Sequence, residues 1–328
     1  MKNKTNNSYT ALIGCGYWGT NIARSLINIG KKKIFVYDSN NKNSNLLKNR
    51  FRGNIIVEKN LKKILKNHLI SNVILATPPK DNLNLLKKCM MSKKNIFIEK
   101  PGLKNLNEIK KLEKYKNKKI LMFGYIYIFN EHIKFIKKFI SNKENGKLLY
   151  INFQRQNLGP IRNDVNVSYD LSSHDLSIVL YLFNNLPNKI NHNSYKILKN
   201  NISDISNLNF KLKNIFFDIN NSWLNPEKVR KITIITSKKM LLFNELDNLN
   251  KIKIFNKYAE YPKINYFDNS YFKNKAKIYI GKNHTPKIKS NDPLCDELKH
   301  FFNCIKKNNK PLTNINFAKK ILKSLQKV

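Results

Sequence analysis

Short apolar runs alternate with amphipathic segments through the first 124 residues, and this alternation constrains the fold more than any other feature. The apolar runs are residues 9–14, 33–37, 54–57, 72–76, 95–98 and 119–124. The segments with helical periodicity are 19–29, 61–67, 83–91 and 106–115. Strands separated by helices of about ten residues indicate βαβ units and a parallel sheet buried on both faces. We expect residues 1–124 to form an α/β domain with a doubly wound parallel sheet.

The second half of the chain, residues 125–328, shows a different pattern. Its strand-like runs are 147–155, 190–198, 208–220, 231–236, 240–243 and 252–255. Its helical patterns are 131–140, 174–183, a segment that Asp292-Pro293 opens and that runs to about Cys304, and 316–326. Several of the strand-like runs are close enough along the chain to pair as antiparallel hairpins, with a turn at 237–239. We expect an α+β domain with one large, mostly antiparallel sheet.

Composition supports a chain with two globular domains. With 328 residues and 41% hydrophobic side chains, the chain can bury a sizeable core. The longest apolar run, Ile120–Phe129, is too short to cross a membrane, so no membrane insertion is expected. The polar N-terminus does not resemble a signal peptide. Four cysteines without CxxC spacing and histidines without a metal-like cluster favour a cytoplasmic protein with free thiols and no metal site.

The formal net charge of +41 raises the question of nucleic-acid binding. Of the 62 basic residues 56 are Lys, and the chain also holds 54 Asn residues. Lys, Asn and Ile share A/T-rich codons, so genome composition accounts for their excess together. A nucleic-acid surface favours Arg and gathers its basic residues in one stripe, whereas these lysines are spread along the chain. We expect a solvated basic surface and no nucleic-acid partner, although the field would attract a polyanionic small substrate.

A glycine-rich turn joins the first expected strand to the first helix. Its sequence is Ile13-Gly14-Cys15-Gly16-Tyr17-Trp18-Gly19, a GxGxxG pattern. The first glycine permits the tight turn, the second lets the backbone approach a pyrophosphate, and the third lets helix and strand pack closely. The N-terminus of the helix offers N–H groups to the phosphates. The turn predicts a dinucleotide-binding Rossmann domain, with Gly14, Gly16, Tyr17, Trp18 and Gly19 in the cofactor site.

A carboxylate at the end of the second expected strand indicates which dinucleotide binds. Asp38 lies 24 residues after Gly14. At that position a carboxylate accepts hydrogen bonds from the adenosine ribose hydroxyls and repels a 2′-phosphate. NAD is therefore favoured over NADP as the cofactor. The alternative is a glycine turn followed by a solvated Asp.

Two further loops follow strands at the carboxyl edge of the sheet, where ligands of such sheets bind. Thr77-Pro78 follows the fourth strand, and Glu99-Lys100-Pro101 follows the fifth. With the glycine-rich turn upstream, this order of motifs resembles the Gfo/Idh/MocA oxidoreductase family. The resemblance implies that Lys100 lies beside the nicotinamide and the substrate hydroxyl. Thr77, Pro78 and Glu99 are expected in the cofactor site.

A D-x-x-x-H pattern in the second half resembles the same family. Asp170 and His174 are four residues apart, so a turn–helix junction can present both side chains on one face. A neutral His near pH 7 can take a hydroxyl proton as hydride leaves the neighbouring carbon. The resemblance implies that His174 is this base and that Asp170 orients the sugar hydroxyl or the imidazole. The alternatives are a capping Asp and a core His, with Asp175 as another partner for the imidazole or for the helix N-terminus.

The stretch before that helix bears on the substrate. Residues 157–170, NLGPIRNDVNVSYD, resemble the nucleotide-sugar branch of the family, the UDP-N-acetylglucosamine and UDP-N-acetylglucosaminuronate 3-dehydrogenases of surface-polysaccharide synthesis. The resemblance implies substrate contacts from Arg162, Asn166 and Asn130. The fork of Arg162 suits a carboxylate or a phosphate, and pairing with Asp164 is the equally weighted alternative.

The chain departs from this branch at four places, one of which is Tyr169, where the branch has a Trp. Tyr125 stands where the branch commonly has a His, Glu131 where it has a Pro, and Ser172-Ser173 where it has Ala-Pro. These differences bear on polar contacts to the substrate and leave the residues expected for hydride transfer in place.

We therefore expect an NAD-dependent dehydrogenase that oxidises a ring hydroxyl, at C3, of a UDP-N-acetylhexosamine or its uronate. The alternatives are a dehydrogenase of a free sugar or an inositol-type polyol, and a non-catalytic NAD-binding sensor. The resemblance also implies a homodimer or homotetramer built through the exposed face of the second sheet.

Overall fold

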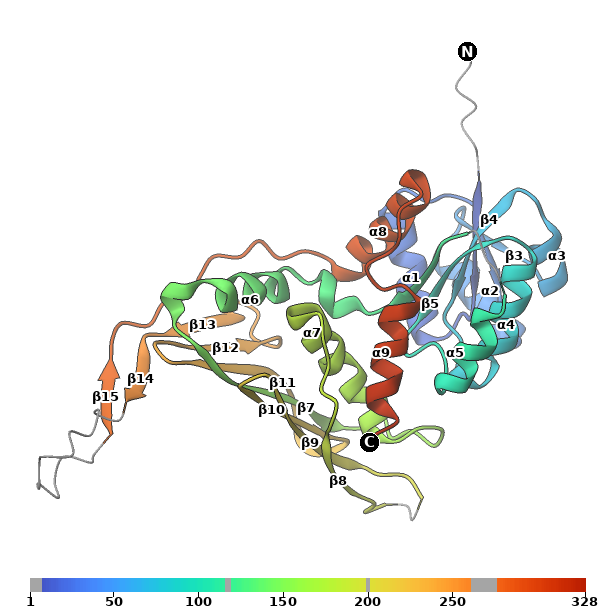
Figure 1. The fold of residues 1–328 in the computed structure, drawn as a ribbon. Coiled ribbons are helices and arrows are strands. Elements are labelled where there is room, and N and C mark those ends of the chain that lie inside the picture. The colour runs from blue at the N-terminus through green and yellow to red at the C-terminus, as the bar shows by residue number, and fades with distance from the viewer. Residues whose placement is uncertain (1–7, 116–118, 199–200, 261–275) are drawn as a thin grey trace, which may run out of the picture. The chain divides into compact units, whose positions relative to one another are not determined.

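The computed structural model describes residues 8–115, 119–198, 201–260 and 276–328. The chain divides into two compact units. The first unit comprises Met1–Phe129 and Asn291–Gln326, and the second comprises Asn130–Ser290 and Lys327–Val328. Figure 1 draws the elements of both units.

The first unit is built on a six-stranded parallel sheet with the order β3-β2-β1-β4-β5-β6 (Figure 1). Its strands are β1 (Tyr9–Ile13), β2 (Ile34–Tyr37), β3 (Ile55–Val57), β4 (Ile70–Leu75), β5 (Asn95–Glu99) and β6 (Leu121–Gly124). Its helices between strands are α1 (Tyr17–Asn28), α2 (Asn41–Arg50), α3 (Leu61–Lys66), α4 (Pro79–Met91) and α5 (Leu106–Glu113). The strand order reverses between β1 and β4, which is where ligands of doubly wound sheets bind. The predicted parallel sheet is confirmed.

Apolar side chains explain why these strands lie in the middle of the unit. Leu12, Val73 and Phe97 are fully buried in β1, β4 and β5, as expected of strands that are covered on both faces. Helix α1 contributes the buried side chains Ile22 and Leu26, which are four residues apart and lie on one face of the helix.

The last two helices complete the first unit. They are α8 (Pro293–Lys307) and α9 (Ile315–Leu325). Phe301 of α8 packs edge-on against Phe97 of β5 at 5.9 Å between ring centroids. Phe317 of α9 packs against Tyr125 at 5.2 Å. The sequence analysis placed both helices in a continuous second domain, 125–328. The helices themselves were predicted, but amphipathic periodicity does not identify the surface on which an apolar face packs.

The second unit is built on a seven-stranded sheet with the order β13-β12-β11-β7-β10-β9-β8. Its strands are β7 (Leu148–Leu158), β8 (Asn191–Tyr195), β9 (Ile205–Leu212), β10 (Ile215–Ser222), β11 (Leu224–Thr236), β12 (Met240–Asn244) and β13 (Ile252–Phe255). All neighbouring pairs are antiparallel except β7 and β10, which are parallel. The predicted mostly antiparallel sheet is confirmed. A small separate pair consists of β14 (Lys257–Glu260) and β15 (Lys277–Ile280).

Helical segments accompany the larger sheet of the second unit. They are α6 (Glu131–Ser141), a 3₁₀ turn (Lys143–Asn145), a π-helical turn (Ser168–Ser172) and α7 (Ser173–Phe183). A further 3₁₀ turn (Ile126–Phe129) belongs to the first unit. The core of the second unit includes Phe153, Phe217 and Ile234, each of which is almost fully buried.

Two local elements differ from the sequence prediction. Helix α2 was not predicted, because its only apolar residues are Leu46 and Leu47 and no periodic stripe marks it; the Asn40 side chain caps its N-terminus by accepting a hydrogen bond from the Lys42 backbone. The strand-like run 208–220 is a hairpin, since β9 and β10 pair around a turn in which Lys213 has a φ of 56°. The expected turn at 237–239 joins β11 to β12, and Asp292 caps α8 as expected.

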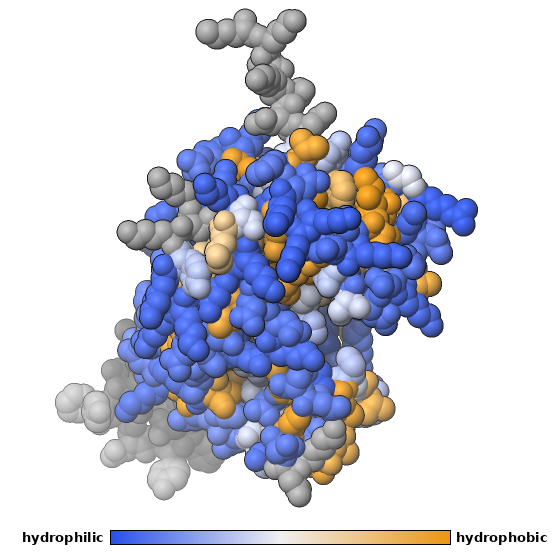
Figure 2. Space-filling model, turned by 90° about the vertical axis from the view of Figure 1, so that its right-hand side faces the viewer, coloured by the Kyte–Doolittle hydropathy of each residue, from blue (hydrophilic) through white to orange (hydrophobic). Residues whose placement is uncertain are grey.

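The surface is mainly hydrophilic, as its lysine content predicts. Figure 2 shows one face of the molecule, on which hydrophobic side chains are scattered among hydrophilic ones. Isolated apolar residues of this kind are normal on a globular protein.

The packing of α8 on the parallel sheet predicts a large effect of one side chain. Replacement of Phe301, which is fully buried, by Ala is expected to lower the free energy of unfolding by about 3–5 kcal/mol. Phe302→Ala is the matched control and is expected to cost less, because Phe302 is half-buried. Urea denaturation of both variants measures the difference. Equal losses would show that α8 does not contribute to this core.

Candidate active site

The glycine-rich turn leaves open space in front of helix α1. Gly14 has a φ of +94°, and a Cβ there would lie 2.5 Å from the Ala76 carbonyl oxygen. A Cβ on Gly19 would lie 2.0 Å from the Gly14 carbonyl oxygen. By contrast, a Cβ on Gly16 would meet nothing within 4 Å, and no side chain caps the helix there. Two glycines are thus required for packing, and the third exposes the N–H groups that suit a pyrophosphate.

Asp38 is fixed at the end of β2 beside this turn. Its Oδ2 accepts a hydrogen bond of 2.7 Å from the Cys15 backbone, and its Oδ1 accepts one of 2.8 Å from the Asn40 backbone. Burial and the charge of Asp38 raise the pKa of the Cys15 thiol to about 12, so the thiol stays protonated. The carboxylate is therefore held in one orientation and is half-buried, with lone pairs left for further donors.

A cavity of about 680 Å³ lies against both features. Its lining includes these predicted cofactor-binding residues: Gly14, Gly16, Tyr17, Trp18, Asp38, Thr77 and Pro78. The predicted residues Gly19, Glu99 and Lys100 are not part of this lining. Asn43, Asp81 and Asn84 are lining residues that the sequence analysis missed, since they lie on α2 and α4 with no motif around them.

Asn82 of α4 connects the two loops at the carboxyl edge. The Thr77 hydroxyl donates to Asn82 Oδ1 at 2.5 Å, and Asn82 Nδ2 donates to the Gly102 carbonyl oxygen at 2.8 Å. Asn82 is almost fully buried, so these hydrogen bonds form away from water. The loop after β4 and the loop that carries Lys100 are thus held together by one amide group.

A buried pair of carboxyl groups lies next to Lys100. Burial raises the pKa of Glu99 to about 7, although the Trp18 indole and the charge of Lys100 favour its charged form. Burial and the charge of Glu99 raise the pKa of Glu297 well above its usual range, and a hydrogen bond from the Tyr125 backbone opposes this shift only in part. Two adjacent buried carboxyls cannot both ionise readily. The pair therefore holds at least one proton at neutral pH.

Gly124 provides the space for this pair. A Cβ on Gly124 would lie 3.2 Å from Glu99 Oε1 and 2.9 Å from the Phe97 ring. No side chain among the described residues donates a hydrogen bond to either oxygen of Glu297. The sequence analysis predicted Glu99 in the site and missed Glu297.

The second unit carries Asp170 and His174 at the junction of the π-helical turn and α7. Both are half-buried. Arg162 Nη1 donates to Asp170 Oδ1 at 3.4 Å, so two of the predicted site residues are in contact. The same guanidinium makes two hydrogen bonds to Asp164, of 2.9 and 2.7 Å. These hydrogen bonds and the charges of both carboxylates raise the pKa of Arg162 further.

The remaining predicted substrate contacts hold backbone in place. Asn130 caps α6, where its side-chain oxygen accepts a hydrogen bond of 2.8 Å from the His132 backbone. Asn166 Oδ1 accepts one of 3.0 Å from the Ser203 backbone. The Asn166 backbone oxygen also accepts a hydrogen bond of 3.1 Å from the Asp170 backbone. The role of Asn130 and Asn166 in substrate binding stays a prediction.

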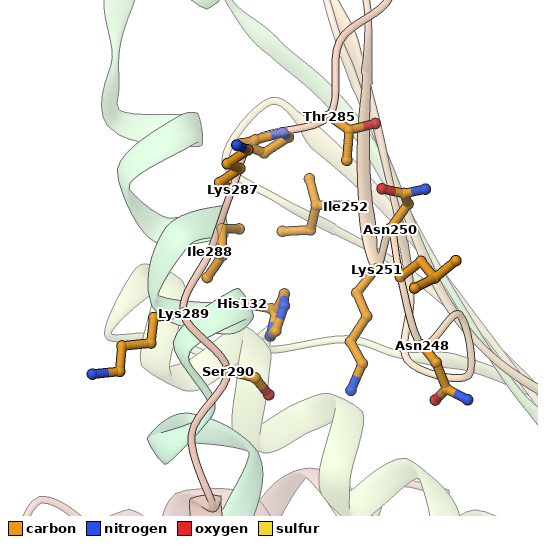
Figure 3. Close-up of a pocket in the computed structure, with 12 residues that line it drawn as sticks. His132, Asn248, Asn250, Lys251, Ile252, Thr285, Lys287, Ile288, Lys289 and Ser290 are labelled. Carbon is orange, nitrogen blue, oxygen red and sulfur yellow. The ribbon is translucent and has the colours of Figure 1, made fainter.

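Another hollow, of about 690 Å³, lies elsewhere in the second unit. Figure 3 shows its lining, which comes from His132 of α6 and from residues 248–252 and 285–290. Burial and the charge of Lys251 lower the pKa of His132. This hollow contains none of the predicted site residues, and the sequence analysis did not anticipate it.

Metal ligands and membrane spans were also sought in the structure. Within the described ranges, no three or more His, Cys, Asp or Glu side chains are grouped so as to hold a metal ion. None of the helices that the structure describes is long and apolar enough to cross a membrane.

One known family model matches the N-terminal part of the chain. Residues 9–136 match the Gfo/Idh/MocA family model, described as an oxidoreductase family with an NAD-binding Rossmann fold. The predicted family and its cofactor, NAD, are thereby confirmed for this part of the chain. No curated protein matches the sequence.

Solved structures share the fold along nearly the whole chain. UDP-N-acetylglucosamine 3-dehydrogenase from Acidithiobacillus ferrooxidans has a TM-score of 0.79 at 17% identity, over 98% of this chain and 96% of that one. GenD2 from gentamicin A biosynthesis, in complex with NAD, has a TM-score of 0.78 at 12% identity, with coverage of 98% and 93%. Levoglucosan dehydrogenase, in complex with NADH and levoglucosan, has a TM-score of 0.78 at 12% identity, with coverage of 98% and 96%. At these identities the likeness shows the fold alone.

The buried carboxyl pair predicts how stability depends on pH. Both folded-state pKa values are raised, so the folded protein binds protons more tightly than the unfolded chain, and stability falls as pH rises from about 4.5 through 7. Glu297→Gln removes one carboxyl and its repulsion of Glu99. It is expected to raise the free energy of unfolding at pH 8 by about 1–3 kcal/mol and to change it little at pH 5. Urea denaturation at both pH values measures this.

Glu113→Gln serves as the control for that series, because Glu113 is an exposed acid of the same unit. Its pH profile is expected to follow that of the wild type. A Glu297→Gln profile that also runs parallel to the wild type would contradict a shared proton.

Proposed function

Because residues 9–136 belong to the NAD-binding Rossmann fold of the Gfo/Idh/MocA oxidoreductases, we propose that the protein is an NAD-dependent sugar dehydrogenase. Its proposed reaction oxidises a ring hydroxyl, at C3, of a UDP-N-acetylhexosamine or its uronate. The observation that carries the proposal is the cavity in which the open N-terminus of α1 and the fixed Asp38 carboxylate lie together. This pairing suits a dinucleotide better than it suits any other common ligand.

The residues of the cavity fit the two ends of the ADP moiety. The backbone at Gly16 has room for a pyrophosphate, since a Cβ there would meet nothing within 4 Å. Asp38 has carboxylate lone pairs for the ribose hydroxyls, and its negative charge opposes a 2′-phosphate. When bound, NAD supplies a hydride acceptor.

The proposed proton chemistry uses three of the predicted site residues. His174 takes the proton from the substrate hydroxyl, Asp170 orients that hydroxyl or the imidazole, and Lys100 stabilises the negative charge that develops on the oxygen. Lys100 and His174 are both half-buried, so ligands can reach them. The Glu99 carboxyl group beside Lys100 is buried.

Two lines of support favour a nucleotide sugar as substrate. The stretch 157–170 resembles the nucleotide-sugar branch, and the fold is shared with the UDP-N-acetylglucosamine 3-dehydrogenase. Arg162 supplies a cation beside Asp170. An anionic group of the substrate would compete with Asp164 for the guanidinium, and Asp164 is more exposed than Arg162.

A free sugar or polyol is the second candidate substrate. The levoglucosan dehydrogenase, in complex with NADH and levoglucosan, shares the fold. The guanidinium of Arg162 is already engaged by two carboxylates, which suits a substrate without an anionic group.

An absorbance assay for reduced nicotinamide tests the proposal. Purified protein and NAD are mixed with UDP-N-acetylglucosamine, its uronate, free N-acetylglucosamine or myo-inositol, with and without 2-oxoglutarate. Turnover of a UDP-sugar alone supports the nucleotide-sugar function, and turnover of a free polyol supports the second candidate. Binding of NAD without turnover of any compound argues against both.

Removal of the proposed chemical groups is expected to abolish turnover and to spare cofactor binding. Lys100→Ala and His174→Ala are each expected to lower kcat about 10²–10⁴-fold. Fluorescence titration with NADH checks that the cofactor still binds. A variant that keeps more than a tenth of the wild-type kcat has lost a residue outside the chemistry.

Replacement of Asp38 tests the basis of cofactor choice. Asp38→Asn keeps the size of the side chain and removes the charge that opposes a 2′-phosphate. The dissociation constant of NADP divided by that of NAD is expected to fall at least about tenfold. Glu58→Gln, an acid at the end of the neighbouring strand β3, is the control. An unchanged ratio in Asp38→Asn would exclude this carboxylate as the selective group.

A further inference from the structure

The second unit buries a network of four hydrogen-bonded polar side chains next to the turn that carries Asp170 and His174. They are Arg155, Asp175, Asn221 and Ser172, with relative exposures of 6%, 1%, 1% and 0%. Such residues are usually exposed, and each buried one needs its hydrogen bonds satisfied.

The charged part of this network is an ion pair between the sheet and helix α7. Arg155 Nη2 and Nε both donate to Asp175 Oδ1, at 2.8 and 3.2 Å. Arg155 lies on β7, and Asp175 lies in the first turn of α7. Since a buried charge without its partner is costly, this pair has a strong preference for one arrangement.

The Asn221 amide connects the ion pair to the π-helical turn. Asn221 of β10 is the register partner of Arg155 on the neighbouring strand. Its Nδ2 donates to Asp175 Oδ2 at 3.2 Å, and its Oδ1 accepts a hydrogen bond from the Ser172 hydroxyl. Both oxygens of Asp175 and both ends of the Asn221 amide are therefore engaged.

Two residues of the network, Ser172 and Asp175, lie next to His174 in the sequence. Ser172 precedes His174 by two residues and Asp175 follows it by one, so the backbone of His174 is held on both sides. Ser173 adds a hydrogen bond of 3.0 Å from its hydroxyl to the Asp170 carbonyl oxygen, and Ser177 adds one of 2.6 Å to that of His174. Each pair lies on one face of a helix, because its members are three or four residues apart. Successive residues of a helix are turned by about 100°, so Ser172 and Asp175 face away from Asp170 and His174.

We propose that Ser172, Asn221 and Asp175, together with Arg155, are positioning residues that fix the turn of Asp170 and His174 to the sheet. The inference rests on the proposed function, because that function gives the turn its chemical task. A base must lie within hydrogen-bond reach of the proton that it takes. A displacement of about 1 Å in such a group can cost about 100-fold in rate. The buried network supplies the rigidity, and the half-buried pair remains accessible to substrate.

Ser172→Ala is the most selective variant for a test. Asp175→Asn would leave the charge of Arg155 unpaired, and a loss of activity there could reflect unfolding. Ser172→Ala removes one hydroxyl, leaves the ion pair intact and frees one end of the Asn221 amide. Ser206→Ala is the matched control: Ser206 is buried in β9 as the register partner of Asn221, but its hydroxyl is hydrogen-bonded to His192 and not to the network.

The kinetic measurement separates positioning from a general structural role. Ser172→Ala is expected to lower kcat about tenfold or more, with KM and the NADH dissociation constant within about twofold of the wild type. Ser206→Ala is expected to keep kcat within about twofold, although both variants lose the hydrogen bond of a buried serine and some thermal stability. Equal kcat values in the two variants would overturn the inference.

A spectroscopic measurement keeps this test independent of the proposed function. In protein labelled at histidine, the ring resonance of His174 is assigned by its loss in His174→Gln. Ser172→Ala is expected to shift this resonance and its titration midpoint, and Ser206→Ala is expected to leave both unchanged. If no substrate is turned over, the proposed function is wrong, and the His174 resonance still tests the positioning role of Ser172. An unmoved resonance in Ser172→Ala overturns the positioning role.

Discussion

The close approach of helix α1 to strand β1 is the constraint on which the nucleotide half depends. Gly19 lies so close to the Gly14 carbonyl that a Cβ would be 2.0 Å from it. That approach brings the N-terminus of α1 to the carboxyl edge of the sheet, and Gly16 leaves it uncovered. The same turn presents the Cys15 N–H to Asp38. One backbone arrangement therefore creates the anion-binding end of the helix and orients the carboxylate that faces the cavity.

How much of this could be predicted from the sequence follows from the range of each interaction. The alternation of strands and helices, the GxGxxG turn and the cap at Asp292 depend on neighbouring residues, and all of them could be predicted. The packing of Phe301 against Phe97 joins residues about two hundred positions apart. Periodicity shows that α8 has an apolar face but not what covers it. For this reason the first unit was expected to end at 124, without the two C-terminal helices.

Two of the residues that sequence reasoning missed, Glu297 and Asn82, are buried and polar, and they share a signal. Glu297 falls between Leu294 and Phe301 on the apolar stripe of α8, and Asn82 falls on the stripe of α4 with Leu86 and Cys89. A polar residue on the buried face of a helix costs free energy unless it is hydrogen-bonded. Here Asn82 joins two ligand loops, and Glu297 shares its environment with Glu99 beside Lys100.

Each unit combines a residue with a proposed role in catalysis and a buried carboxyl neighbour. Lys100 follows Glu99, and His174 precedes Asp175. Lys100 and His174 are half-buried, and the carboxyl groups of Glu99 and Asp175 lie in the interior. In a chain with only 21 acidic residues against 62 basic ones, carboxylates are scarce. Most exposed ion pairs would contribute little to stability at the surface. The two buried carboxyls act on their neighbours in different ways. Asp175 joins the helix of His174 to the sheet through Arg155, and Glu99 sets the charge beside Lys100.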